Sequence, residues 1–203
     1  MKYASGIRSR FRDAPAFTVR DLKVFLEGKK IGEAYLHLLV HNMLASGELK
    51  RITRGVYTFR DDVQVAGFGF TPFYYGLQDA LSLHGFWEQE ANPVIITPRR
   101  VRQGVREFNG RNFVLRRIER KMFFGFSMQR SSGLWIPVSD PEKTLIDFAY
   151  YREPLGKDAL AALSEKIDRK RLAAYLARSP ARVRRRVRGM LSALGRRRPA
   201  RVL

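Results

Sequence analysis

Basic residues are distributed unevenly along this chain and are concentrated at its two ends. Lysine and arginine number 39 against 19 acidic residues, which gives a net charge of +20. Residues 1–60 hold 12 basic and 5 acidic side chains, residues 61–152 hold 12 and 10, and residues 180–203 hold 9 arginines and no acid. Two basic ends therefore flank a nearly neutral middle. Such a charge predicts a polyanionic partner, nucleic acid first, with a surface tuned only for solubility as the alternative.

Composition excludes several classes of protein. The chain has no cysteine, which rules out a disulfide scaffold, a thiolate nucleophile and Cys-ligated metal sites. Hydrophobic residues make up 45% of the 203 positions, as in a folded globular protein. No window approaches 18 uninterrupted apolar residues, and the first residues lack the apolar region of a signal peptide. We therefore expect a cytoplasmic protein that does not cross a membrane.

The first sixty residues have the periodicity of three short helices followed by a β-hairpin. Residues 4–11 show the apolar spacing of a first helix. Thr18 precedes Asp21 by three residues, which is typical of a capping box at the start of a second helix. A third helix is predicted over residues 31–46, and the segments on either side of a turn at 53–55 alternate apolar and polar side chains. This order predicts an amino-terminal winged helix-turn-helix.

A winged helix-turn-helix places its third helix in the major groove, while its hairpin reaches phosphates or the adjoining minor groove. The residues that the pattern predicts to contact DNA are Lys29, Lys30, His37, His41, Arg51 and Arg54. The histidine pair also has the i, i+4 spacing of metal ligands, but no glutamate follows the first histidine as it does in HExxH, so we expect no metal. A protein-interaction module or a spacer stays open as an alternative for this segment.

The middle of the chain has the pattern of a mixed α/β domain. Asn109-Gly110 is a strong signal for a hairpin turn, and Asp140-Pro141 is typical of a helix start, with an N-cap and a proline at the first helical position. The segment PVIIT has the β-branched composition of a strand buried on both faces. The predicted elements are a helix over 72–84 and strands at 93–97, 105–108, 112–118, 122–128 and 134–138.

We find no catalytic constellation in this segment. His84 has no nucleophile-elbow context and is interpreted as a packed or capping histidine. The GFG sequence at 67–69 lacks the further glycine and the lysine of a phosphate-binding loop. Glu142 and Lys143 are adjacent at a helix start, whereas a metal nuclease needs a carboxylate and a lysine one residue apart on a strand. We therefore predict a protein that is not an enzyme and needs no cofactor.

The carboxyl-terminal part is predicted to form three helices. Asp168 is placed to cap the second, and the third has a narrow apolar stripe with arginines over the rest of its surface. Arg182, Arg185 and Arg186 are predicted to contact phosphate oxygens of DNA, with an acidic partner as the alternative. Attachment to a membrane surface is less favoured because the stripe lacks Trp and Phe. The biased tail at 196–203 is predicted to be disordered.

Several motifs together resemble the AbiEi-type antitoxins of type IV toxin-antitoxin systems, which act in abortive infection. The resemblance covers roughly residues 5–195, and it lies in RGVY at 54–57, ALSLHGF at 80–86, PVIIT at 93–97 and DPEKTLIDF at 140–148. It implies a repressor that binds inverted repeats in the promoter of its own operon. It further implies a second domain that antagonises a nucleotidyltransferase-like toxin, typically without a stable complex.

The resemblance also implies roles for particular residues. It adds Arg20 to the predicted DNA-contacting face and gives a structural role, near the end of the sheet, to Glu142, Lys143 and Asp147. The arginine density after Pro180 is heavier than the family requires, so the last helices are not assigned to toxin neutralisation alone.

The predicted fold class is α+β. The expected domains are a winged helix-turn-helix at 1–62, an α/β antitoxin domain with carboxyl-terminal helices at 63–195, and the basic tail. We expect an antitoxin that represses its own operon. The alternative is an orphan DNA-binding regulator whose second domain senses a ligand or dimerises.

Overall fold

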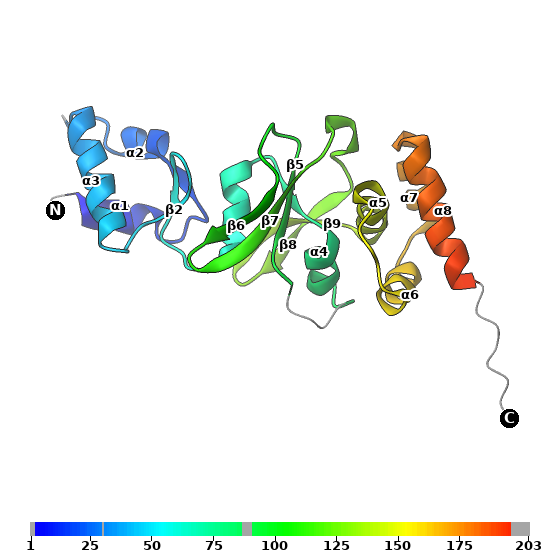
Figure 1. The fold of residues 1–203 in the computed structure, drawn as a ribbon. Helices are drawn as coiled ribbons and strands as arrows, with labels where there is room; N and C mark the ends of the chain where they lie inside the picture. Colours follow the sequence, from blue (N-terminus) through cyan, green and yellow to red (C-terminus); the bar gives the residue numbers. More distant parts are fainter. Residues whose placement is uncertain (1–2, 30, 87–90, 196–203) are drawn as a thin grey trace, which may run out of the picture. The chain divides into compact units, whose positions relative to one another are not determined.

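The computed structural model describes residues 3–29, 31–86 and 91–195, and its fold is α+β, as predicted (Figure 1). Its contacts divide the chain into two compact units. The first consists of Met1–Pro72 with Val105–Phe113, and the second consists of Phe73–Gly104 with Val114–Leu203. The sequence analysis placed the boundary at residues 62/63, whereas by contacts residues 63–72 and 105–113 group with the first unit. In the part of the chain that the structure describes, none of the helices has the length and apolarity to cross a membrane.

The first unit contains three helices and a small antiparallel sheet around a core of its own. Within this sheet the strand order is β1-β3-β2. Apolar side chains from all three helices and from the sheet fill the core, among them Ile7, Leu22, Leu39 and Tyr57. Its elements are α1 (Ala4–Phe11), β1 (Phe17–Thr18), α2 (Val19–Phe25), α3 (Glu33–Ala45), β2 (Lys50–Thr53), β3 (Val56–Thr58) and the 3-10 helix η1 (Val63–Phe70).

Local signals in the sequence set the helix boundaries of this unit. The Thr18 hydroxyl accepts the Asp21 backbone N–H, and the Asp21 carboxylate accepts the Thr18 backbone N–H, so the predicted capping box is confirmed. The third predicted helix is α3, and its buried stripe consists of Leu36, Leu39, Val40 and Met43. The side of α3 opposite this stripe is exposed to solvent.

The hairpin of β2 and β3 turns at Gly55, whose φ of 77° favours glycine. Strand β1 extends this hairpin on the other side of β3, with Thr18 opposite Val56. In addition, the Val19 backbone N–H donates to the Gly55 carbonyl at 3.2 Å. The start of α2 is therefore fixed beside the tip of the hairpin.

The second unit is built on a mixed sheet, whose strands also include residues 105–113 of the first unit, and on five α-helices in the described residues. Strands β4 and β9 pair in parallel, as do β5 and β7, while β4 with β5 and β8 with β9 are antiparallel. The strand order of the whole sheet is β6-β7-β5-β4-β9-β8, and β6 and β7 form a hairpin at its edge. The elements are β4 (Tyr74–Tyr75), α4 (Leu77–Leu83), β5 (Val94–Thr97), β6 (Gly104–Phe108), β7 (Arg111–Arg117), the 3-10 helix η2 (Arg120–Met122), β8 (Phe126–Ser131), β9 (Leu134–Ser139), α5 (Pro141–Tyr151), α6 (Lys157–Glu165), α7 (Arg169–Arg178) and α8 (Ala181–Gly195).

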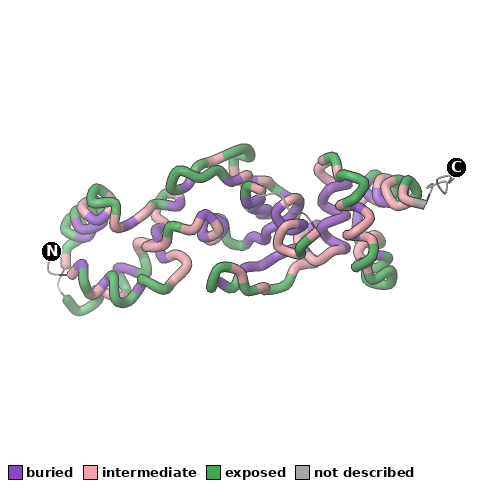
Figure 2. The backbone as a smooth tube through the Cα atoms, turned by 90° about the horizontal axis from the view of Figure 1, so that it is seen from below, coloured by how far each residue is buried: buried purple, intermediate pink, exposed green. Residues whose placement is uncertain are grey.

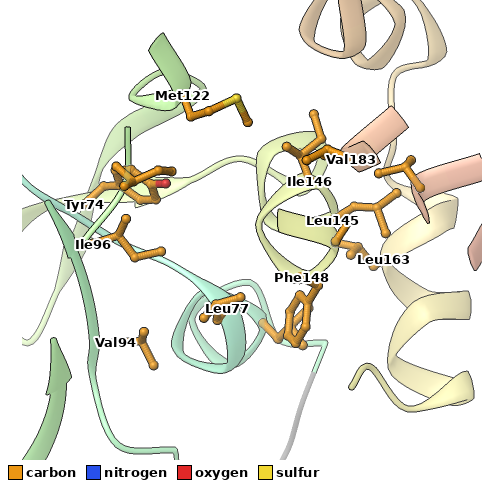
Figure 3. Close-up of a cluster of buried hydrophobic side chains, with 14 of the residues drawn as sticks. Tyr74, Leu77, Val94, Ile96, Met122, Leu145, Ile146, Phe148, Leu163 and Val183 are labelled. Carbon is orange, nitrogen blue, oxygen red and sulfur yellow. The ribbon is translucent and has the colours of Figure 1, made fainter. Parts of the chain in front are cut away.

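Helix α5 is the centre of the second core (Figure 3). Asp140 caps it by accepting the Lys143 backbone N–H at 2.7 Å, and Pro141 occupies the first turn, as predicted. Ile146 lies toward Val183 of α8, and Phe148 lies toward Leu77 of α4 (Figure 3). Figure 2 shows that burial is nearly continuous along α5, whereas it alternates along the helices that follow.

Two predicted elements of this unit differ from the structure in their bounds: the helix at its start, and the strand at its start and, by three residues, at its end. The helix expected over 72–84 begins only at Leu77, because Tyr74 and Tyr75 form β4, paired with Ile96 and Ile95 of β5. The strand expected over 122–128 begins only at Phe126, because Gly125 has a φ of 74° and approaches α5 so closely that a Cβ would lie 2.8 Å from that of Lys143. Both errors reflect long-range packing that local periodicity does not contain.

The remaining predicted elements of the second part are confirmed. Asn109 and Gly110 both have positive φ, 50° and 74°, as the predicted hairpin turn requires. Strand β5 is buried along its whole length. Asp168 accepts the backbone N–H groups of Lys170 and Arg171 at the start of α7. The tail at 196–203 lies outside the described residues.

Candidate nucleic-acid interface

The hairpin tip and the start of α2 bring two predicted DNA contacts together. Arg54 lies in the turn next to Gly55, and Arg20 follows Val19, so the Val19–Gly55 hydrogen bond holds the two arginines on adjacent segments. Arg51 lies on β2 and pairs with Tyr57 of β3. On its other side Tyr57 pairs with Phe17 of β1. All three arginines are exposed. Strand β2, the hairpin turn and the start of α2 thus each carry one exposed arginine.

A second set of contacts extends from Arg20 along α2 and α3. Lys23 lies one turn beyond Arg20, and its Nζ donates to Glu33 Oε1 at 2.7 Å. The same carboxylate oxygen lies 3.8 Å from Nε2 of His37, one turn further along α3. His41 follows at the next turn and is exposed. We call these residues, with Arg51 and Arg54, the α2–α3–hairpin surface; its cationic members are Arg20, Lys23, Arg51 and Arg54.

The charge of Glu33 decides how α3 meets an anion. Glu33 is the only charged residue of α3. The hydrogen bond from Lys23 and the charges of Lys23 and His37 lower the pKa of this carboxyl, so it is ionised and paired. Lys23 therefore offsets the negative charge that α3 itself would present to a phosphate. The sequence analysis missed this role of Lys23, because the pair joins two helices across a loop.

The loop before α3 holds a further predicted contact. Nζ of Lys29 lies 4.9 Å from the centre of the Phe25 ring and 5.5 Å from that of Tyr3, which are cation–π distances. Its side chain remains exposed. The predicted neighbour Lys30 lies outside the described residues.

The predicted contacts on α8 belong to the second unit and differ from one another in environment. Arg186 is half-buried and donates to the Ala149 carbonyl at 3.3 Å, so it fastens α8 to α5. Arg182 lies 3.9 Å from a carboxylate oxygen of Glu119 and 5.7 Å from the centre of the Tyr150 ring. Arg185 is exposed on the same helix. Arg185 is therefore the member of the set with the greatest freedom to meet a partner.

The EKTLID segment forms a buried polar cluster. The Lys143 ammonium pairs with the Asp147 carboxylate one turn away, and both side chains are fully buried. The Tyr74 hydroxyl donates to Asp147 Oδ2 at 2.9 Å. Burial raises the pKa of Asp147 and lowers the pKa of Lys143, and the charge of each partner opposes that shift. Because the pair is enclosed by α5, β4 and the Phe124 ring, the geometry assigns it to the core.

The other polar residues of this region join helices to one another. Glu142 accepts the Asp168 backbone N–H at 2.6 Å, and Asp140 accepts the Tyr175 hydroxyl at 2.8 Å. His84 is the C-cap residue of α4, and its Nε2 lies 2.7 Å from the Ser139 carbonyl oxygen. Within the described ranges, no three His, Asp or Glu side chains lie close enough together to hold a metal ion.

The chain thus combines a cationic unit of helices and a hairpin with a unit built on a mixed sheet. The sequence profile of the AbiEi antitoxin C-terminal domain matches residues 74–193. That match covers more than half of the chain, which therefore belongs to the AbiEi antitoxin family, a regulatory and non-enzymatic family. The predicted resemblance is confirmed.

A solved structure has the same fold over nearly the whole chain. The crystal structure of the RV2827C protein from Mycobacterium tuberculosis aligns with a TM-score of 0.65 at 16% sequence identity, covering 96% of this chain and 78% of that one. At this identity the likeness extends to the fold. None of the curated proteins matches the chain.

Proposed function

We propose that the protein is an antitoxin that represses its own toxin-antitoxin operon and antagonises a nucleotidyltransferase-like toxin. The observation that carries this proposal is the AbiEi antitoxin match over residues 74–193, because an antitoxin family implies a toxin partner. On this account the α5-centred unit counteracts the toxin, typically without a stable complex. An operon repressor acts where the DNA is, so we place the protein in the cytoplasm.

The first unit supplies the DNA-binding half of the proposal. Its element order, α1-β1-α2-α3-β2-β3, supports a winged helix-turn-helix, in which α2 and α3 would be the helix pair and β2–β3 the wing. On this account α3 enters the major groove of an operator with inverted repeats. Phosphates are contacted by Arg20, Lys29, Arg51 and Arg54, all of which are exposed. Base edges are faced by His37 and His41. The pairing of Glu33 with Lys23 supports this placement.

The arginines of α8 extend the proposal to the second unit. Arg182 and Arg185 are exposed and cationic, which suits phosphate oxygens, whereas Arg186 is already engaged with a backbone carbonyl. If α8 contacts the operator, Arg185→Ala lowers the salt dependence of DNA binding. If Arg185→Ala changes only toxin antagonism, the arginines of α8 bind an acidic partner instead of DNA.

Removing Arg20 and Arg54 is expected to weaken promoter binding and its dependence on salt. Each lost phosphate contact reduces the slope of log K against log salt by about 0.9, so the double variant Arg20→Ala/Arg54→Ala loses about two units. The measurement is fluorescence anisotropy of the full chain on the duplex directly upstream of its operon, over a series of salt concentrations.

The matched control removes one positive charge elsewhere. Lys157 is exposed at the start of α6 and is not a member of the α2–α3–hairpin surface, so Lys157→Ala is expected to keep the wild-type slope. An unchanged slope in the double variant would show that these arginines do not meet the backbone of DNA. Wild-type binding that does not distinguish the promoter from an unrelated duplex would contradict the repressor role itself.

A further inference from the structure

The outward face of α3 has an unusual composition for a helix that meets DNA. Opposite the buried stripe, the centre of the face is Leu38, whose side chain is 54% exposed. At about 100° per residue, Ala34, His41, Asn42 and Ala45 all fall within about 60° of Leu38. No lysine, arginine or glutamine occurs anywhere in α3. The face therefore has an apolar side chain, Leu38, at its centre, with the polar side chains of His41 and Asn42 beside it and no lysine or arginine of its own.

This composition restricts what α3 is able to read. Guanine is commonly read by Arg or Lys and adenine by Asn or Gln. At the centre of α3, however, the most prominent group is the isobutyl side chain of Leu38. The apolar feature that base edges offer in the major groove is the C5-methyl group of a pyrimidine. The surrounding arginines of α2 and the hairpin are suited to phosphates, which position a helix but carry no base identity.

We propose that Leu38 is a specificity-determining residue that recognises pyrimidine C5-methyl groups in the major groove. The inference deepens the proposed function and rests on it. Charge supports DNA over a protein partner, because the one acid of α3, Glu33, is paired with Lys23 of α2, and Arg20 precedes Lys23 by one turn. Thymine and 5-methylcytosine both carry the recognised methyl group, and the experiment distinguishes these two sources.

The test uses the promoter duplex with thymines replaced one at a time by deoxyuridine, a change that removes only the C5-methyl group. We expect wild-type affinity to fall about fourfold at one or two positions in each half-site, which corresponds to about 0.8 kcal/mol for one buried methyl-sized group. Leu38→Ala binds the unmodified duplex more weakly and does not respond to deoxyuridine at those positions. A second duplex series replaces cytosines by 5-methylcytosine; a gain in wild-type affinity there identifies methylated cytosine as the source.

The matched control is Val24→Ala. Val24 is also apolar and is 62% exposed, but it lies on α2, so this variant keeps the full response to deoxyuridine. If Leu38→Ala and the wild type lose affinity equally on deoxyuridine, the methyl proposal is wrong while promoter binding stands. If Leu38→Ala leaves DNA binding unchanged and abolishes toxin antagonism instead, the face binds a protein and the proposal is overturned. If the wild type shows no preference for the promoter, the proposed function fails first.

Discussion

Replacing Lys143 by methionine is expected to destabilise the protein by about 3–5 kcal/mol, because it leaves the buried Asp147 carboxylate without its counter-charge. Lys143 and Asp147 are both fully buried, and the Tyr74 hydroxyl also donates a hydrogen bond to that carboxylate. Methionine has a similar length and fills the same space between the Tyr74 and Phe124 rings. The measurement is guanidinium-induced unfolding followed by far-UV circular dichroism.

A double variant separates the charge from the packing. Lys143→Met/Asp147→Asn removes both charges and keeps an oxygen that accepts from the Tyr74 hydroxyl. We expect it to be more stable than Lys143→Met alone by at least about 1 kcal/mol, because no unpaired charge is left in the core. If the two substitutions instead add without interaction, the two side chains do not act as a pair.

Truncating Phe148 to alanine is expected to have an effect of similar size. Its ring is fully buried on α5 within the core that Figure 3 shows, and its loss leaves a cavity where α4 packs against α5. Such Phe→Ala changes in cores cost about 3–5 kcal/mol, through lost burial and the cavity together. The same unfolding measurement applies, and the reduced stability is expected to lower the level of folded antitoxin in cells.

Two variants control for size and for exposure. Phe148→Leu keeps most of the apolar volume and is expected to cost less than about half as much as Phe148→Ala. Trp135 on β9 is larger than Phe148 but 62% exposed, so Trp135→Ala is expected to change stability by only about 0.5 kcal/mol. Equal losses in Phe148→Ala and Trp135→Ala would mean that α5 is not the centre of this core.

Elements with a local signal were predictable from the sequence. The capping box of Thr18 and Asp21, the Asp140-Pro141 helix start and the Asn109-Gly110 turn all depend on residues within a few positions of one another. The two-residue strand β4 was not predictable, because a strand of this length has no periodicity and exists only through its pairing with β5 and β9. The start of β8 was missed for the same reason, since Gly125 is positioned by α5.

The candidate site was likewise predictable only where residue type alone identifies a contact. Charge counts directed attention to the arginines of the hairpin and of α8, but they did not distinguish a free guanidinium from an engaged one. Arg186 donates to the carbonyl of Ala149, a residue far away in sequence, and so acts within the fold. Lys23 was overlooked because its value lies in pairing with Glu33 across the loop between two helices. Tertiary contacts, rather than residue type, separate the structural cations from those able to meet a partner.

The antitoxin role is tested most directly by growth. The full chain, expressed from an independent inducible promoter, is combined with the proposed nucleotidyltransferase-like toxin, and surviving colonies are counted. An independent promoter keeps repression of the operon out of the readout, so the count reports antagonism of the toxin alone. We expect the chain to restore growth to the level of cells without toxin. Growth arrest that persists while the full-length, folded chain accumulates would contradict it.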